Sequence, residues 1–347
     1  MPKTYDLYRE HSVSLDKGML PQPCVEEFRY IINRCTKERR SHGGLSSYMY
    51  LRIQKCGLKA HNTLGNNIVC MLAENGNLEC AQKTIEAIIR KDVWAWESIL
   101  NAYISYGCMQ SALLLYQKKD EYVRKNEYVS SSGHLDPRTF VALLKSCSKL
   151  KNLRCGIHIH GDIDNSGLLR QNLFVGSTLV DMYAKCGCLE KAQKVFDEVL
   201  ERSVVTWNAL IGAYGQNGYA KRCLETFDEL MLSHDHHMAK PNNISFSCVL
   251  STCADMCLLG YGKKIHVYII ECSMETDVMI SSALINLYGK CWRLEEAQWM
   301  FDTLHERNLV TWNSIISAHS LYGNAKQVTE IFEQMKIEGV KPNESTM

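Results

Sequence analysis

The sequence lacks several features by which common protein classes are recognised. It has 16 cysteines among 347 residues but no two at CxxC spacing, so the ligand spacing of a zinc finger is missing. No apolar run approaches the length of a membrane-spanning helix, and we expect no contact with a membrane. The net charge is only +1 with neutral histidines. No overall field therefore attracts the chain to nucleic acid or lipid, and any such site must come from local placement of side chains.

Signatures of catalysis are missing as well. The sequence has no HxE…PCxxC pattern of zinc deaminases, no glycine-rich phosphate-binding loop and no nucleophile elbow. We therefore predict that the chain is not an enzyme and that it uses no metal and no cofactor.

The cysteines are numerous, but their placement argues against a disulfide framework. Several recur at equivalent places inside helical stretches: Cys35, Cys147 and Cys253 in one set, Cys186 and Cys291 in another. This placement is typical of small buried apolar residues in a reducing compartment, and we expect these cysteines to be unpaired.

A long internal repeat is the main positive feature. Residues 173–203 return as residues 278–308, and thirteen of the 31 paired positions are identical. A third copy, with fewer matches, has Leu78-Glu79-Cys80-Ala81-Gln82 where the first has Leu189-Glu190-Lys191-Ala192-Gln193. Self-similarity at a fixed period indicates a stacked repeat array.

The array accounts for nearly the whole chain. Residues 1–24 form an irregular leader, whose mixture of acidic and basic residues does not make a convincing transit peptide. Residues 344–347 begin an incomplete unit, so we expect the natural array to continue beyond them. Nine units lie between: 25–61, 62–92, 93–136, 137–172, 173–203, 204–242, 243–277, 278–308 and 309–343.

Each unit has the pattern of two helices. In 173–203, Leu179 and Tyr183 lie one turn apart, Gly187 interrupts the pattern, and Ala192 and Phe196 begin a second stripe. Neither helix can bury its stripe alone, whereas stacked hairpins can. We predict an all-α fold, an α-solenoid in which helix-turn-helix repeats form a right-handed superhelix.

The motifs now identify a family. VTWNALI at 205–211, DMYAKCGCLEKAQKVFDE at 181–198 and GIHIHGDIDNSG at 156–167 resemble the repeats of plant pentatricopeptide repeat proteins. The alternation of long units with 31-residue units is similar to the subclass with mixed long and short motifs. The resemblance implies an adaptor that binds single-stranded RNA, one base per repeat, in organellar editing, splicing or stability. It also implies a mitochondrial location, with the chloroplast as alternative, and a separate editing or processing enzyme as a possible partner.

The resemblance further implies that the fifth and last residues of a unit select the base. On that basis Asn66 with Asp92 is similar to a uridine pair, and Ser282 with Asn308 to an adenosine pair. Ser247 with Asp277 is similar to a guanosine pair. Asn208 with Asn242, and Asn313 with Asn343, are similar to pyrimidine pairs that favour cytidine. Four other pairs match no such pattern: Arg29/His61, Glu97/Asp136, Val141/Asn172 and Ser177/Ser203.

Two further kinds of contact follow from the same resemblance. Val205 and Val310, second in their units, would offer apolar walls to the bases. Lys185 and Lys290, about two helical turns past the fifth residues, would face the phosphates.

Simpler interpretations exist for the same residues. Asn208 and Asn313 are also expected as helix N-caps, and Lys185 and Lys290 as solvated surface charges. We expect Trp207, Trp312, His160 and His266 to have structural packing roles, and we consider a metal site at His234, His236 and His237 only as an alternative. For the whole protein, the alternative is a peptide-binding scaffold of the tetratricopeptide type.

Overall fold

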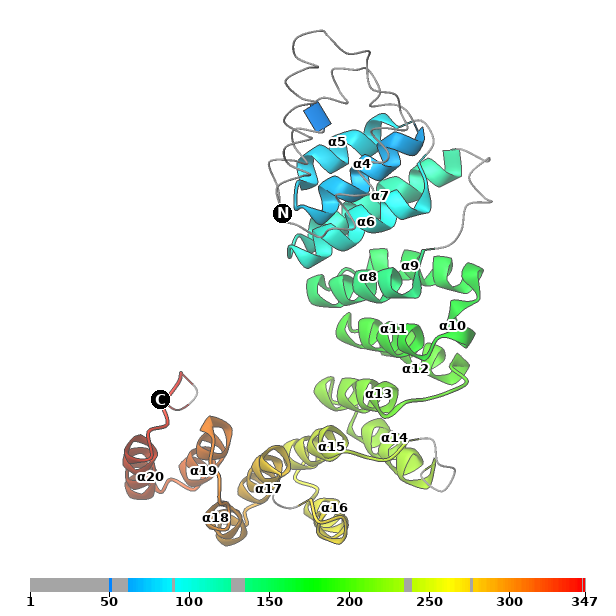
Figure 1. Ribbon diagram of the computed structural model, residues 1–347. Helices are drawn as coiled ribbons and strands as arrows, with labels where there is room; N and C mark the ends of the chain where they lie inside the picture. Colours follow the sequence, from blue (N-terminus) through cyan, green and yellow to red (C-terminus); the bar gives the residue numbers. More distant parts are fainter. Residues whose placement is uncertain are drawn as a thin grey trace, which may run out of the picture. The chain divides into compact units, whose positions relative to one another are not determined.

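The computed structural model describes residues 50–51, 62–88, 91–125, 135–233, 239–274, 277–344 and 346. Within these ranges every regular element is an α-helix, and none is a strand (Figure 1). None of these helices is long and apolar enough to span a membrane. The predicted leader and the unit 25–61 fall mostly outside the described residues. The chain divides into two compact parts, Met1–Leu150 and Lys151–Met347, which are described separately below.

The first part contains two complete helix pairs and the first helix of a third pair. The helix α6 packs against α4, α7 and α8, and α5 folds back on α4. A hydrogen bond from the Tyr103 hydroxyl to Gln82 Oε1, 2.7 Å long, links α6 to α5. The helices are α4 (Asn62–Glu74), α5 (Leu78–Ala87), α6 (Val93–Ser105), α7 (Met109–Lys125) and α8 (Pro137–Leu150).

The second part is a longer stack of helix pairs (Figure 1). The first helices of successive units, α11 (Leu173–Lys185), α13 (Val204–Gln216), α15 (Asn243–Asp255), α17 (Val278–Lys290) and α19 (Leu309–Leu321), each contact the next. Each of them also packs on the second helix of its own unit. These second helices are α12 (Leu189–Glu198), α14 (Ala220–Ser233), α16 (Leu259–Glu271), α18 (Leu294–Asp302) and α20 (Ala325–Ile337). Before α11 come α9 (Leu153–Ser166) and the short α10 (Leu168–Gln171). The predicted all-α solenoid is confirmed.

In six of the described units, the last residue caps the first helix of the next unit. Side chains of this kind accept hydrogen bonds from backbone N–H groups in the first turn, which otherwise lack partners. Asn242 and Asn308 additionally form capping boxes with Ser245 and Thr311. The capping residues are Asp92, Asn172, Ser203, Asn242, Asp277 and Asn308.

The glycine that we expected to end the first helix of 173–203 does so. Gly187 has φ +76°, the left-handed conformation that glycine adopts without a steric penalty. In the unit 278–308 the equivalent residue is Trp292, which has φ +61° and lies against the Tyr322 ring with centroids 5.1 Å apart. The turn between the two helices therefore keeps its geometry when the glycine is absent.

Aromatic contacts join two of the 31-residue units, 173–203 and 278–308, to the units that follow them. Phe196 meets Trp207 edge to face at 4.7 Å between centroids, and Phe301 meets Trp312 at 4.8 Å. Both tryptophans are buried, as predicted. Such pairs add about 0.5–1.5 kcal/mol to the free energy of area burial.

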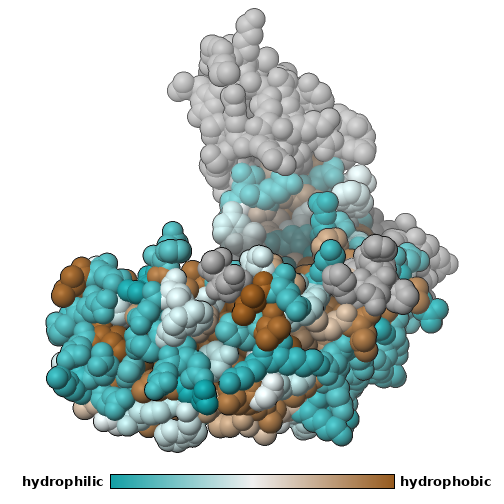
Figure 2. All heavy atoms as spheres, turned by 90° about the horizontal axis from the view of Figure 1, so that it is seen from below, coloured by the Kyte–Doolittle hydropathy of each residue, from teal (hydrophilic) through white to brown (hydrophobic). Residues whose placement is uncertain are grey.

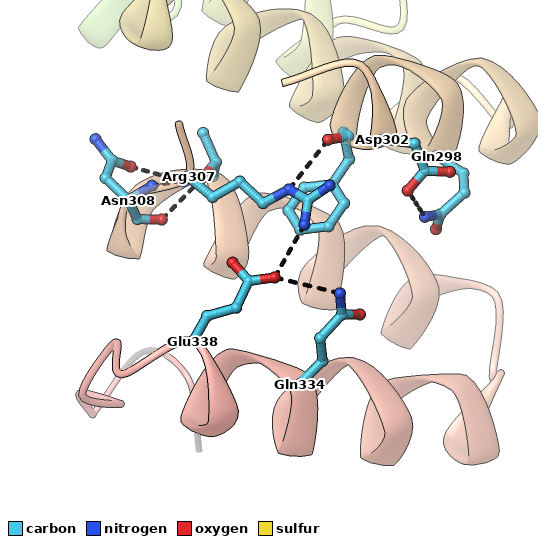
Figure 3. A network of polar contacts seen from close by, with 8 residues as sticks. Gln298, Asp302, Arg307, Asn308, Gln334 and Glu338 are labelled. Carbon is cyan, nitrogen blue, oxygen red and sulfur yellow. Dashed lines mark hydrogen bonds and ion pairs between the residues drawn. The ribbon is translucent and has the colours of Figure 1, made fainter. Parts of the chain in front are cut away.

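An arginine covers each of these aromatic pairs. Figure 3 shows Arg307, whose guanidinium lies 4.6 Å from the Phe301 ring and whose Nε donates to the Phe301 carbonyl at 3.4 Å. Its Nη1 pairs with Glu338 Oε1 at 3.1 Å, and Gln334 donates to the same oxygen at 3.3 Å. The arginine thereby connects α18 with the end of α20.

Several of the cysteines that recur in register lie in the core. Cys147 and Cys253 are fully buried, Cys291 is nearly so, and Cys186 is half-buried. Burial raises the pKa of Cys253 to about 12. These residues pack as small apolar side chains with protonated thiols.

Candidate nucleic-acid interface

The fifth residue of one unit and its last residue meet at the start of the following helix. Asn208 lies one turn inside α13, and its Nδ2 donates to Oδ1 of Asn242 at 3.0 Å. Asn242 in turn accepts the backbone N–H of Ser245 at 3.1 Å and so caps α15. Asn208 and Asn242 are both half-buried.

The same arrangement recurs three units later. Asn313 in α19 donates from Nδ2 to Oδ1 of Asn343 at 3.2 Å, and Thr346 contacts both amides at 2.7 and 2.9 Å. Two sites 105 residues apart therefore present the same pair of amides. Asn208 and Asn313 are not N-caps, because Ser203 and Asn308 begin their helices; that alternative was wrong.

Three pairs in other units also come together. Ser177 and Ser203 lie 3.3 Å apart between their hydroxyl oxygens, and both contact Thr206. The carboxylate of Glu97 accepts from the backbone N–H of Asp136. Sequence reasoning matched neither pair to a pattern, although both pairs occupy the fifth and last positions of their units, as the asparagine pairs do. The buried Asn66 accepts from the backbone N–H of Asp92 at 3.5 Å.

Two of the expected pairs are not joined in the described structure. Ser282 is 6% exposed, and its hydroxyl donates to the Val278 carbonyl of its own helix at 2.6 Å. Asn308 caps α19. Asp277 receives a hydrogen bond from Asn243, the first residue of its unit, at 3.1 Å, rather than from Ser247. These two units thus present different chemistry from the asparagine pairs.

Exposed apolar side chains occupy the second position of several units. Val205 and Val310, the second residues of their units, are 62% and 57% exposed. Seen from below in Figure 2, hydrophobic residues reach the surface in small groups among hydrophilic ones. The equivalent residues of four other units are also large, apolar and exposed, and sequence reasoning missed them: Trp94, Phe174, Ile244 and Met279. An apolar residue directly after the first helical position of six units was the signal that could have identified them; Thr63 and Arg138 hold this place in the units 62–92 and 137–172.

The two lysines lie at the opposite end of their helices. Lys185 Nζ contacts Asp181 at 2.9 Å within α11, and Lys290 Nζ contacts Asp255 of the preceding unit at 2.7 Å. Both lysine side chains are more than a third exposed. Their charge is partly balanced by these carboxylates before any ligand arrives.

The histidines of the repeats are packing residues. His160 Nδ1 and the Tyr183 hydroxyl lie 2.8 Å apart, and His266 Nδ1 and the Tyr288 hydroxyl 2.7 Å apart. Burial lowers the pKa of His160. His234, His236 and His237 lie outside the described residues. Among the described residues, no group of three or more His, Cys, Asp or Glu side chains is placed to hold a metal.

Comparison with known proteins places these repeats in a family. A model for the PPR repeat matches residues 177–204, 205–233 and 280–309, and one for the PPR repeat family matches 307–347. Pentatricopeptide repeat-containing protein At1g50270 of Arabidopsis thaliana is 34% identical over 298 residues, 86% of this chain and 48% of that protein. CRR2, a chloroplastic protein of the same plant, is 31% identical over 82% of this chain and 42% of that protein. The chain thus spans about half the length, or less, of these curated relatives.

Solved structures give the same fold. The pentatricopeptide repeat protein PPR10 in complex with an 18-nt psaJ RNA element superposes with a TM-score of 0.60 at 19% identity. That match covers 88% of this chain and 44% of PPR10. A second structure, of PPR10 from maize, superposes over 98% of this chain with a TM-score of 0.55. The repeats, the relatives and the fold agree, and this chain belongs to the pentatricopeptide repeat family.

Proposed function

We propose that the chain binds single-stranded RNA, one base per unit, as an adaptor without chemistry of its own. The observation that carries the proposal is the identical pairing of Asn208 with Asn242 and of Asn313 with Asn343. A peptide-binding scaffold gives no account of a hydrogen-bonded pair of amides that recurs beside an exposed apolar residue. An amide offers hydrogen-bond donors to a base edge, and the apolar neighbour offers a surface for stacking.

The base order follows from the pairs. The resemblance to the family gives pyrimidine, guanosine, adenosine, pyrimidine along units 204–343, with N-terminal units toward the 5′ end. Because Ser247 and Ser282 are not joined to the last residues of their units, we expect the two pyrimidines, three nucleotides apart, to contribute most selectivity. At Asn66 with Asp92, the expected base is uridine.

The first test changes one fifth residue. Asn208→Thr keeps a short polar group and removes the amide, and the family pattern implies a shift toward adenosine at that nucleotide. Loss of the matched contact should cost about 1–3 kcal/mol, by analogy with edge readout of bases elsewhere. Binding competition between RNAs that differ at the facing nucleotide measures the shift.

Two outcomes would count against the proposal. Equal loss of affinity for all four bases would make Asn208 a packing residue. No change at all would favour the scaffold of the tetratricopeptide type. The nucleotide facing Asn313 is the internal control, because units contact only their neighbours.

The organelle and the RNA-processing step in which the chain acts are also part of the proposal. Relatives named for the chloroplast and for the mitochondrion support an organellar role in editing, splicing or stability. We propose the mitochondrion, the mixed long-and-short subclass, and a separate processing enzyme. Cross-linking to mitochondrial and chloroplast RNA, followed by sequencing of the bound fragments, distinguishes the two compartments.

A further inference from the structure

A third side chain joins each asparagine pair. Ser245, the third residue of the unit after Asn208, lies 2.6 Å from Asn208 Oδ1 and 3.1 Å from Asn242 Oδ1. Thr346 holds the same place beside Asn313 and Asn343. Ser245 is fully buried, and Thr346 is 8% exposed. The three side chains form a closed ring of hydrogen bonds at both sites.

Backbone donors determine the direction of every bond in this ring. The N–H of Ser245 can only donate, so the Asn242 atom it meets at 3.1 Å must be Oδ1. Asn208 must therefore turn its Nδ2 toward Asn242. The N–H of Asn242 donates to Ser245 Oγ at 3.1 Å, so the hydroxyl hydrogen is available for Oδ1 of Asn208. No member of the ring can reverse without losing a bond.

The ring therefore presents one kind of chemistry to a ligand. Both amide oxygens are turned toward the ring, which uses one of the four amide hydrogens of Asn208 and Asn242. The remaining amide hydrogens are donors. Cytosine carries two adjacent acceptors, N3 and O2, on its pairing edge, whereas uracil carries an N3–H donor between its two carbonyls.

We propose that Ser245 and Thr346 are positioning residues that hold the fifth-position amide as a donor and so select cytidine over uridine. The proposal rests on the RNA-binding function proposed above and adds a third residue to the two that read each base. That residue belongs to the following unit.

Other units of the same chain show what happens when the ring is incomplete. Beyond Asn66 the equivalent residue is Ala95, which has no hydroxyl, and Asn66 Oδ1 accepts from the backbone N–H of Asp92 at 3.5 Å. Beyond Ser282 the equivalent residue is Thr311, which exchanges hydrogen bonds with the backbone of Asn308. In the unit 173–203, Ser177 Oγ lies 2.6 Å from the equivalent residue, Thr206, but this contact joins two hydroxyls and has no amide to orient. Among the described residues, the hydroxyl at this place therefore holds an amide as a donor at Asn208 and Asn313.

The experiment removes one hydroxyl at a time from the full chain. We expect Ser245→Ala to lower the preference for cytidine over uridine facing Asn208 by about three- to tenfold, the effect of one ordinary hydrogen bond. The preference facing Asn313 should not change. Ser245→Thr keeps the hydroxyl and should keep the preference. Thr346→Val is the second variant, in case Ser245→Ala does not fold. It should lower the preference for cytidine over uridine facing Asn313 and leave the preference facing Asn208 unchanged.

The outcomes distinguish a failure of this inference from a failure of the proposed RNA-binding function. If Asn208→Ala abolishes the base preference but neither hydroxyl variant alters it, Ser245 and Thr346 are only helix caps and the inference is wrong. If Asn208→Ala also leaves the base preference intact, the proposed recognition of a base by Asn208 is wrong. Reduced preference in either hydroxyl variant at its own site, with the other site unchanged, supports the inference.

Discussion

The Tyr214 hydroxyl donates a hydrogen bond to Gln193 Oε1 across a unit boundary, at 2.6 Å. One period later, Gln298 takes the place of Gln193, and His319 takes the place of the tyrosine at 2.7 Å. Tyr103 and Gln82 form the same bond in the first part of the chain. One of three equivalent junctions therefore holds an imidazole, whose ordinary pKa lies near neutral pH, in place of a phenol.

This substitution predicts a dependence of stability on pH. Gln298 Oε1 can only accept, so Nε2 of His319 carries its proton, and the buried Nδ1 has no hydrogen-bond partner. Burial lowers the pKa of His319 below its ordinary 6.5. Below pH 6.5 the unfolded chain binds a proton that the folded chain resists, so stability is complete above that pH and falls as the pH decreases toward the folded pKa.

The measurement compares the melting temperature at pH 7.5 and at pH 5.5. We expect His319→Tyr, which restores the residue of the other junctions, to reduce the difference between the two values. An unchanged pH dependence in this variant would show that His319 is not the responsible group.

A second prediction concerns close packing of helices. A Cβ on Gly262 in α16 would collide with the Leu287 side chain of α17, whereas one on Gly260 in the same helix would meet nothing within 4 Å. We expect Gly262→Ala to destabilise the fold by about 1–3 kcal/mol through overpacking. Gly260→Ala should stabilise it by up to about 1 kcal/mol through helix propensity. Urea unfolding measures both; equal effects would contradict the packing argument.

A third prediction uses the turns between helices. Gly187 has φ +76° with open space around it, so Gly187→Ala should cost about 1–2 kcal/mol from conformation alone. Lys151 has φ +51° without being a glycine, and Lys151→Gly should therefore raise the urea midpoint. The two substitutions act at the same kind of turn with opposite sign. A lower midpoint for Lys151→Gly would mean that contacts of the lysine outweigh the strain.

A fourth prediction concerns the charge near Lys290. Its ion pair with Asp255 reduces the positive field that it offers to phosphate. We expect Lys290→Gln to weaken RNA binding about equally for all sequences and to reduce the salt slope by about one. Asp255→Asn should tighten binding at low salt. If neither variant alters the salt slope, Lys290 is a surface charge without a role in binding.

The sequence by itself determined the repeat, the helix pairs and most of the core. Hydrophobic spacing placed Tyr183 and Phe196 inside, and Gly187 marked a helix end, because these properties depend on local periodicity and backbone freedom. The resemblance to the family singled out Asn208 and Asn242 as two residues that act together on one base, and the structure shows that their side chains are hydrogen-bonded.

Only the tertiary structure decided which of the matching positions form a pair. Ser177 and Ser282, at the same position of their units, both bond to the carbonyl four residues before them, and Ser177 also lies 3.3 Å from Ser203. A serine hydroxyl in a helix can bond to the carbonyl four residues before it, and its reach to a neighbouring helix depends on how closely the two helices pack. An asparagine amide extends further from the backbone, so its pairs tolerate that variation. The distance between helices, which no residue pattern contains, therefore determines what each unit presents.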